Sequence, residues 1–178
     1  MRHLKSILIL AVLGMSTGCV KIASVHPLFS DTAREVVFDP VLLGKWQGED
    51  TDKSIFEVTR LDKTGYAVAF EMDGKPLKAT FHLLKSRGLS LLDAIYTDNR
   101  GPEHMFLKIR IEPDTLWVAT ADSTWLRERI VASGKPRYTV VDEDLLLTAS
   151  SSELRKALLP YLAKPEAFDD EGELKRVK

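Results

Sequence analysis

The sequence predicts a mostly β domain, a single antiparallel meander that closes into a barrel, with two short α-helices in the C-terminal half. Three observations predict this fold. From Trp46 to Ala121, apolar and polar residues alternate in short runs, as in strands with one buried and one solvated face. Turn residues such as Gly65, Gly74 and Gly88 separate the runs. A sheet of about eight such strands usually closes, because closure removes its exposed edges.

The N-terminus reads as a signal peptide followed by a lipidation site. Arg2 and Lys5 precede a short apolar run, which the small residues at 16–18 separate from Cys19. The run is too short to cross a bilayer, which takes roughly 20 apolar residues. A cysteine directly after small residues resembles the lipobox of bacterial lipoproteins, although that family usually has Leu in place of Ser16. The resemblance implies removal of residues 1–18 and conversion of Cys19 to an N-palmitoyl, S-diacylglycerol cysteine.

Lipidation implies a place in the cell. Two or more acyl chains anchor a protein stably, so we expect a protein held on the bacterial cell envelope. Val20 follows the cysteine. In enteric-type lipoproteins, a residue other than Asp at this position sends the protein to the outer membrane, facing the periplasm. The competing interpretation is an ordinary signal peptide with a chance cysteine.

Composition limits the function classes. The chain has 25 Lys and Arg against 26 Asp and Glu, and loss of residues 1–18 removes two of the basic ones, so there is no basic footprint for nucleic acid. The remaining 160 residues suffice for one domain with a core. With Cys19 lipidated no second thiol remains, which excludes disulfides, thiol catalysis and cysteine-ligated metals.

We divide the mature chain into the lipidated cysteine and tether, 19–34, and one domain, 35–178. Part of the tether is expected to pack on the domain, since it is neither Gly/Ser-rich nor of low complexity. Asp39-Pro40 starts a short helical turn. Helices are expected from Asp122 to Ser133, with Gly134 as the stop, and after Ser150, where Ser150 and Glu153 match a capping box. A strand pair should separate the helices, and the tail 168–177 can supply a last strand.

Two resemblances refine the fold. Gly44-Lys45-Trp46, at the start of the first barrel strand, resembles the Gly-x-Trp signature of lipocalins. In that family the tryptophan closes the barrel floor, often under an arginine from near the chain end, a part that Arg176 can play here. The longer pattern is similar to a group of bacterial lipoproteins without an established activity. It comprises His26–Phe29, Val37–Trp46, His104-Met105-Phe106 and Leu147–Leu154.

No catalytic, cofactor or metal motif stands out. Residues 14–18 match the hydrolase pattern Gly-x-Ser-x-Gly, but lie in the segment expected to be removed. His26, His82 and His104 lack the close spacing of a helical zinc site, and on the meander order a strand separates the last two. The acidic runs at 49–52, 142–144 and 169–171 lack the regular spacing of a calcium loop. We therefore expect no metal, no cofactor and no enzymatic activity.

Three residues are candidates for ligand contacts. Asp93 interrupts the apolar run 91–95, and a buried carboxylate needs a partner or a shifted pKa. It either orients a ligand or faces solvent at a strand bend. Trp117 and Trp125 can line a pocket, although large aromatic residues in such register are more often core.

Two functional hypotheses of different class follow. In the first, the barrel binds an apolar small molecule or lipid, which requires an internal cavity of several hundred Å³. In the second, the barrel is a scaffold and the protein is an accessory envelope lipoprotein that acts through protein–protein contacts, which predicts a contiguous exposed apolar patch. An enzyme would require Asp93 to converge with His82 or His104 in one cleft.

Overall fold

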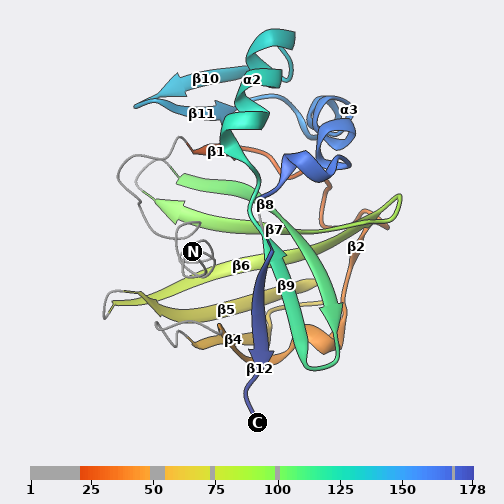
Figure 1. The fold of residues 1–178 in the computed structure, drawn as a ribbon, viewed down its shortest axis with the longest axis vertical. Helices are drawn as coiled ribbons and strands as arrows, with labels where there is room; N and C mark the ends of the chain where they lie inside the picture. Colours follow the sequence, from red (N-terminus) through yellow and green to blue (C-terminus); the bar gives the residue numbers. More distant parts are fainter. Residues whose placement is uncertain (1–20, 49–54, 73–74, 99–100, 170) are drawn as a thin grey trace.

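The computed structural model describes residues 21–48, 55–72, 75–98, 101–169 and 171–178, and its main feature is a closed antiparallel barrel of eight strands (Figure 1). Around the barrel, the strands follow the order β3-β4-β5-β6-β7-β8-β9-β12, and β12 pairs again with β3. Their bounds are β3 Gly44–Gly48, β4 Ile55–Arg60, β5 Gly65–Met72, β6 Lys75–Ser86, β7 Leu89–Asp98, β8 Gly101–Glu112, β9 Thr115–Ala119 and β12 Gly172–Arg176. The predicted barrel is confirmed.

Strand β12 closes the barrel from the far end of the chain. Leu174 lies opposite Gly48 of β3 on one side and opposite Leu116 of β9 on the other, and both pairings are antiparallel. The last strand expected within 168–177 is thus present. Because β12 pairs with strands more than 50 residues earlier in the sequence, closure of the barrel depends on the C-terminal strand.

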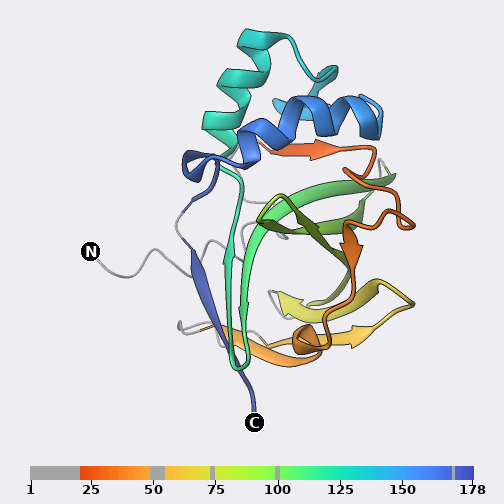
Figure 2. The same ribbon diagram turned by 90° about the vertical axis from the view of Figure 1, so that its right-hand side faces the viewer.

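An insertion between β9 and β12 interrupts the meander. It contains helix α2 (Ser123–Ser133), strands β10 (Tyr138–Val141) and β11 (Asp144–Leu147), helix α3 (Ser151–Leu162) and the 3-10 helix η2 (Pro165–Ala167). The expected strand pair exists, but it lies outside the barrel. It joins β1 (Ile22–Ser24), which is parallel to β11 and meets β8 at His104. Figure 2 shows this layer stacked on one end of the barrel.

Both helices begin where the sequence indicates. The Asp122 carboxylate accepts a hydrogen bond from Trp125 N at 2.9 Å, and α2 ends at Gly134, whose φ of 63° suits a glycine. At α3, Ser150 and Glu153 form the expected capping box. A third cap lies before β3, where Asp39 accepts from Val41 N at the start of the 3-10 helix η1 (Pro40–Leu42).

The fold has two apolar cores, one on each side of the barrel wall. Inward-facing residues of the barrel strands form the first, which includes Trp46, Leu83 and Leu107. The second lies between the outer wall and the helices, and includes Ile130 and Leu158. Since β6, β7 and β8 contribute to both cores, the middle of these strands is buried on both faces.

The segment before the barrel belongs to the second core. Leu28 is 0 % exposed and Phe29 is buried beside it. The Arg155 guanidinium of α3 donates to the Leu28 carbonyl at 2.7 Å and lies over the Phe29 ring. A short strand, β2 (Val36–Val37), then pairs with β6. Within the described ranges, we find no helix with the length and apolar character needed to cross a bilayer.

Candidate functional site

The barrel floor is closed by Trp46 and Arg176. Trp46 is fully buried and its indole Nε1 donates to the Leu42 carbonyl at 2.9 Å. The Arg176 guanidinium lies 4.2 Å from the centre of the indole ring. It also donates to the carbonyls of Val41 (2.7 Å) and Leu43 (2.8 Å), so it joins η1 to the end of β12. Arg176 thus takes the part that the lipocalin resemblance left open to it, and the contact closes this end of the barrel.

Gly44 has two physical reasons to be a glycine. Its φ is 121°, a conformation that residues with a side chain rarely adopt. A Cβ on this residue would also lie 2.9 Å from the Arg176 guanidinium nitrogen. Both residues of the Gly-x-Trp pattern therefore help to close the barrel floor. The tryptophan supplies the packed ring, and the glycine leaves room for the arginine.

The barrel interior is nearly full. The space left inside is about 60 Å³, and its lining is almost entirely apolar, from residues such as Phe56, Phe81 and Leu92. Ligand pockets usually measure roughly 300–1,000 Å³. Among the described residues, the internal space therefore falls short of the several hundred Å³ that the lipid-carrier hypothesis requires.

A larger hollow opens on the outside of the barrel wall. This groove, which we call the β7–β8 groove, has a volume of about 490 Å³. Its lining comes from η1, from the tip of the β6–β7 hairpin and from the end of β8, with Glu171 beside it. The residues are Asp39, Val41, Lys85, Gly88, Leu89, Ser90, Lys108, Ile109, Arg110, Ile111, Glu112, Pro113 and Glu171. Its volume lies within the usual range for ligand sites.

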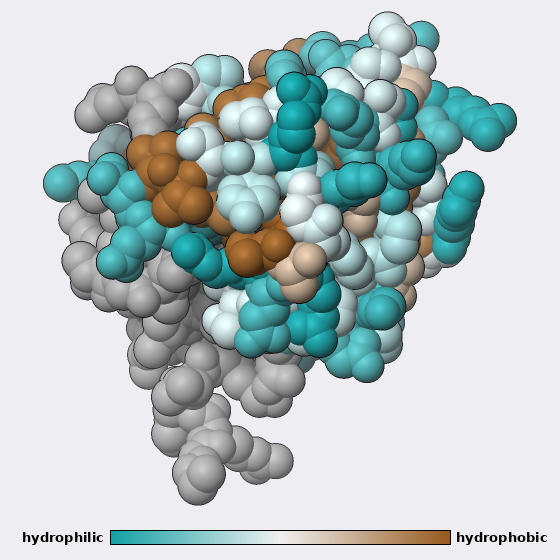
Figure 3. Space-filling view, turned by 90° about the horizontal axis from the view of Figure 1, so that it is seen from above, coloured by the Kyte–Doolittle hydropathy of each residue, from teal (hydrophilic) through white to brown (hydrophobic). Residues whose placement is uncertain are grey.

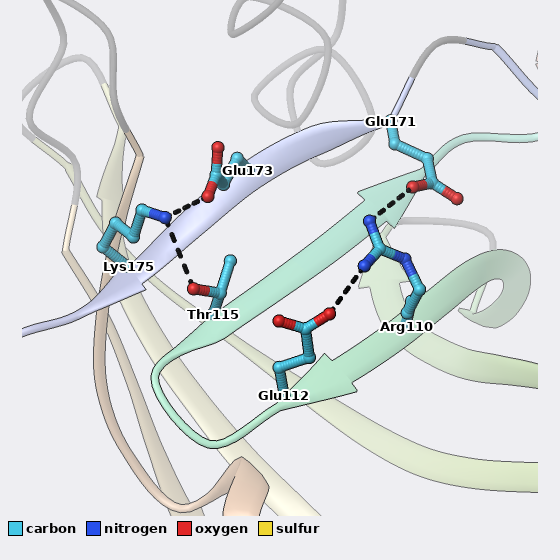
Figure 4. Close-up of polar contacts among 6 residues, drawn as sticks. All are labelled: Arg110, Glu112, Thr115, Glu171, Glu173 and Lys175. Atoms are coloured by element: carbon cyan, nitrogen blue, oxygen red, sulfur yellow. Dashed lines mark hydrogen bonds and ion pairs between the residues drawn. The ribbon is translucent and has the colours of Figure 1, made fainter.

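Ion pairs hold the charged wall of the β7–β8 groove. Arg110 lies between Glu112 at 2.8 Å and Glu171 at 3.4 Å, as Figure 4 shows, and stacks on the Trp117 ring. Lys108 also reaches Glu171, at 3.1 Å. Burial raises the pKa of Glu171, but the hydrogen bonds and charges of Lys108 and Arg110 outweigh it, so the pKa lies below its ordinary value of 4.5. The acidic run at 169–171 therefore does more than solvate a loop.

Asp93 makes a buried pair with His104. It is 1 % exposed, and its Oδ1 lies 2.8 Å from His104 Nδ1 on the adjacent strand. It therefore does not face solvent at a strand bend, which was one of its two predicted roles. Burial raises the pKa of Asp93, although the hydrogen bond and charge of His104 and the charge of His82 oppose that rise. The sequence could not reveal this pair, because it depends on strand register.

The Asp93–His104 pair has the chemistry of a catalytic dyad, but it does not line a space that a substrate could enter. His82 lies opposite Asp93 in the register of β6 and β7, and β7 separates it from β8 as expected. All three residues are buried, and Ser24 of β1 lies opposite His104 in the strand register. None of the three lines the barrel space or the β7–β8 groove. Among the residues that the structure describes, no cluster of three or more His, Cys, Asp or Glu is arranged to hold a metal.

The remaining candidates do not meet in one site. Trp117 lies under Arg110, and Trp125 packs edge-on against Tyr161, so neither lines the barrel space or the groove. Cys19 lies outside the described residues, as does the acidic run at 49–52. Asp142 and Glu143 sit at positive φ in the turn between β10 and β11.

Exposed apolar surface is scattered over the described part of the chain. The large apolar side chains that are exposed there are Ile55, Leu61, Val131 and Val140. Ile55 begins β4 and Leu61 follows its end. The other two lie on α2 and β10, at the opposite end of the molecule (Figure 1). Viewed from the helical end, the surface is mostly hydrophilic with separate apolar spots (Figure 3). The contiguous apolar patch that the scaffold hypothesis predicts is not evident among these residues.

Comparisons with protein-family models, curated proteins and solved structures find no match to this chain. A proposal for its function therefore rests on the sequence and on the geometry of its own residues.

Proposed function

We propose that the protein is a lipid-anchored envelope lipoprotein whose barrel is a rigid scaffold for contacts with other proteins. The observation that carries the scaffold role is the filled interior, with only about 60 Å³ left inside the barrel. An acyl chain would have to displace core side chains such as Phe56 and Leu92, and packed cores resist such rearrangement.

The anchor rests on sequence. The charged start, the apolar run and the small residues before Cys19 support cleavage at that cysteine and its lipidation. Val20 supports the outer membrane as the destination, with the domain in the periplasm. The expectation that the protein needs no cofactor and is not an enzyme belongs to the same proposal, since the Asp93–His104 pair is covered.

Labelling in a bacterial host tests the anchor. The full-length chain is expressed with an alkyne-tagged palmitate, and the label should appear on the wild type but not on a Cys19→Ala variant. The wild type should sediment with outer membranes. A wild-type chain that is cleaved, unlabelled and free in the periplasm would overturn the anchor.

Native mass spectrometry tests the scaffold role against the lipid carrier. The anchored protein is extracted in mild detergent, and its mass is compared before and after denaturation. We expect the mass of the lipidated chain alone. A reproducible additional mass that denaturation releases into organic solvent would identify a carrier and overturn the scaffold role, whatever the result for Cys19.

A further inference from the structure

The β7–β8 groove lies where two paired strands separate. The last pair between β7 and β8 is Leu91 with Lys108. Beyond it, β7 turns back into the β6–β7 hairpin, while β8 runs on to Glu112 and pairs only with β9 among the described strands. One edge of β8 is thus left without a strand partner from Ile109 onward.

Runs of consecutive residues line two walls of this groove. Its lining includes three consecutive residues where the β6–β7 turn leads into β7, from Gly88 to Ser90, and six consecutive residues at and just after the end of β8, from Lys108 to Pro113. Side chains alternate in direction along a strand, so consecutive residues can line one groove only if the strand edge faces it. Backbone N–H and C=O groups along such an edge are a template for another strand.

We propose that the β7–β8 groove binds an extended peptide segment of a partner protein, which adds as a strand to the free edge of β8. This inference rests on the proposed scaffold role and names its docking site. The four residues of β8 from Ile109 to Glu112 span ~13 Å, enough to pair with about four peptide residues. Main-chain hydrogen bonds supply affinity in this mode, and alternate side chains supply specificity.

The side chains along β8 define the chemistry of the peptide. Ile109 and Ile111 face the barrel core, while Lys108, Arg110 and Glu112 carry charge on the outer face. A paired strand therefore places apolar residues toward the two isoleucines and charged residues toward the outside. Opposite-charge cross-strand pairs stabilise a sheet, so an acidic residue belongs opposite Arg110 and a basic one opposite Glu112. The peptide alternates apolar and charged residues of both signs.

A displayed library of random twelve-residue peptides tests this proposal. The library is selected against the full-length protein in lipid nanodiscs. We expect enrichment of the alternating pattern, and protection of the amides at 88–90 and 109–112 from hydrogen exchange when an enriched peptide is added. Protection confined to another surface, or no enrichment over empty nanodiscs, would overturn the proposal.

A pair of variants separates the groove from the rest of the surface. Ser90→Trp fills the groove, whereas Thr59→Trp adds the same bulk to the exposed outer face of β4. We expect the first to weaken peptide binding at least tenfold and the second to leave it unchanged. Equal binding to both variants would contradict the groove as the site.

Two further experiments cover the cases in which Ser90→Trp does not fold or the protein is a dimer. If Ser90→Trp fails to fold, the double variant Lys108→Glu, Arg110→Glu replaces it, with Lys78→Glu on β6 as the control for reversed charge. If the protein proves dimeric and Ser90→Trp makes it monomeric, the edge pairs with a second copy, and the peptide proposal falls. The proposed function is tested separately, because labelling at Cys19 and an empty barrel do not depend on the groove.

Discussion

His104 on β8 and Asp93 on β7 place a ring nitrogen 2.8 Å from a carboxylate oxygen on the outer wall of the barrel. Isolated charges are rarely buried, because removing them from water is costly unless they are paired. Here Ser24 of β1 lies opposite His104 in the strand register, and the pair is buried. The pair therefore lies beside β1, the first described strand after the proposed anchor.

The buried Asp93 predicts a pH dependence of stability. Because its pKa in the folded protein is raised above 3.8, the folded state keeps the proton after the unfolded chain has lost it. The stability that this group contributes is complete below pH 3.8 and is lost as pH rises through the folded pKa. We therefore expect the free energy of unfolding of the wild type, minus that of Asp93→Asn, to fall as pH rises from 3.8.

Urea unfolding of both proteins at a series of pH values measures this difference. Asp31→Asn is a useful second variant, because the charge of Asp31 raises the pKa of Asp93 and its removal should make the fall smaller. A difference that stays constant or rises with pH would show that the Asp93 carboxylate is stabilised as an ion.

The α3 cap predicts the opposite trend. The side chain of Arg137 and the Ser150 cap lower the pKa of Glu153 from 4.5 to about 2. A lowered pKa gives stability that is present above pH 4.5 and lost as pH falls toward 2. The stability advantage of the wild type over Glu153→Gln should therefore be constant above pH 5 and should shrink between these two values. Circular dichroism of acid-titrated samples checks it, and an advantage that persists at the lowest pH would contradict it.

Arg176→Ala should destabilise the barrel by about 2 kcal/mol, because charged hydrogen bonds contribute roughly 1.5–3 kcal/mol and a cation–π contact adds to them. The substitution leaves the carbonyls of Val41 and Leu43 without this donor and uncovers Trp46. Arg176→Lys keeps the charge but not the two guanidinium nitrogens that donate to separate carbonyls. It should recover less than half of the lost stability. Chemical denaturation measures both, with Lys78→Ala as the exposed control. A change for Arg176→Ala no larger than for the control would contradict the role of this contact.

Leu28→Ala should cost about 2–5 kcal/mol, the usual range for a fully buried leucine. Leu28 is 0 % exposed, whereas Ile55 is 44 % exposed, so Ile55→Ala serves as the control and should cost far less. Thermal and chemical unfolding of the two variants checks this. Equal, small effects would mean that the segment before the barrel does not pack on it in solution.

The barrel could be predicted from the sequence because its signals are local. The alternation in β4 to β8 and the turns between these strands depend on neighbouring residues. The helix caps at Asp122 and Ser150 depend on residues within three or four positions in the sequence. The tail was a candidate for a last strand, but its place between β3 and β9 was not predicted. The lipocalin resemblance made Arg176 a candidate for the contact with Trp46.

What could not be predicted depends on distant parts of the chain. The Asp93–His104 contact requires the register between β7 and β8. Strand β1 pairs with residues 123 positions later, and no local pattern in its three residues indicates this. The β7–β8 groove arises where two strands diverge, which depends on the shear of the whole barrel rather than on any motif.

Because the segment before the barrel is packed on the domain, the linker between the proposed lipid anchor and the domain is short. If Cys19 carries the lipid, as proposed, only Val20 and Lys21 separate it from Ile22 of β1, a reach of ~10 Å at full extension. The domain would then sit directly on the bilayer, with β1 and the helical layer nearest the lipid. Helix η1 and the β8–β9 hairpin lie at the other end of the barrel (Figure 2). The groove beside them would face away from the membrane, within reach of proteins that approach from the aqueous side.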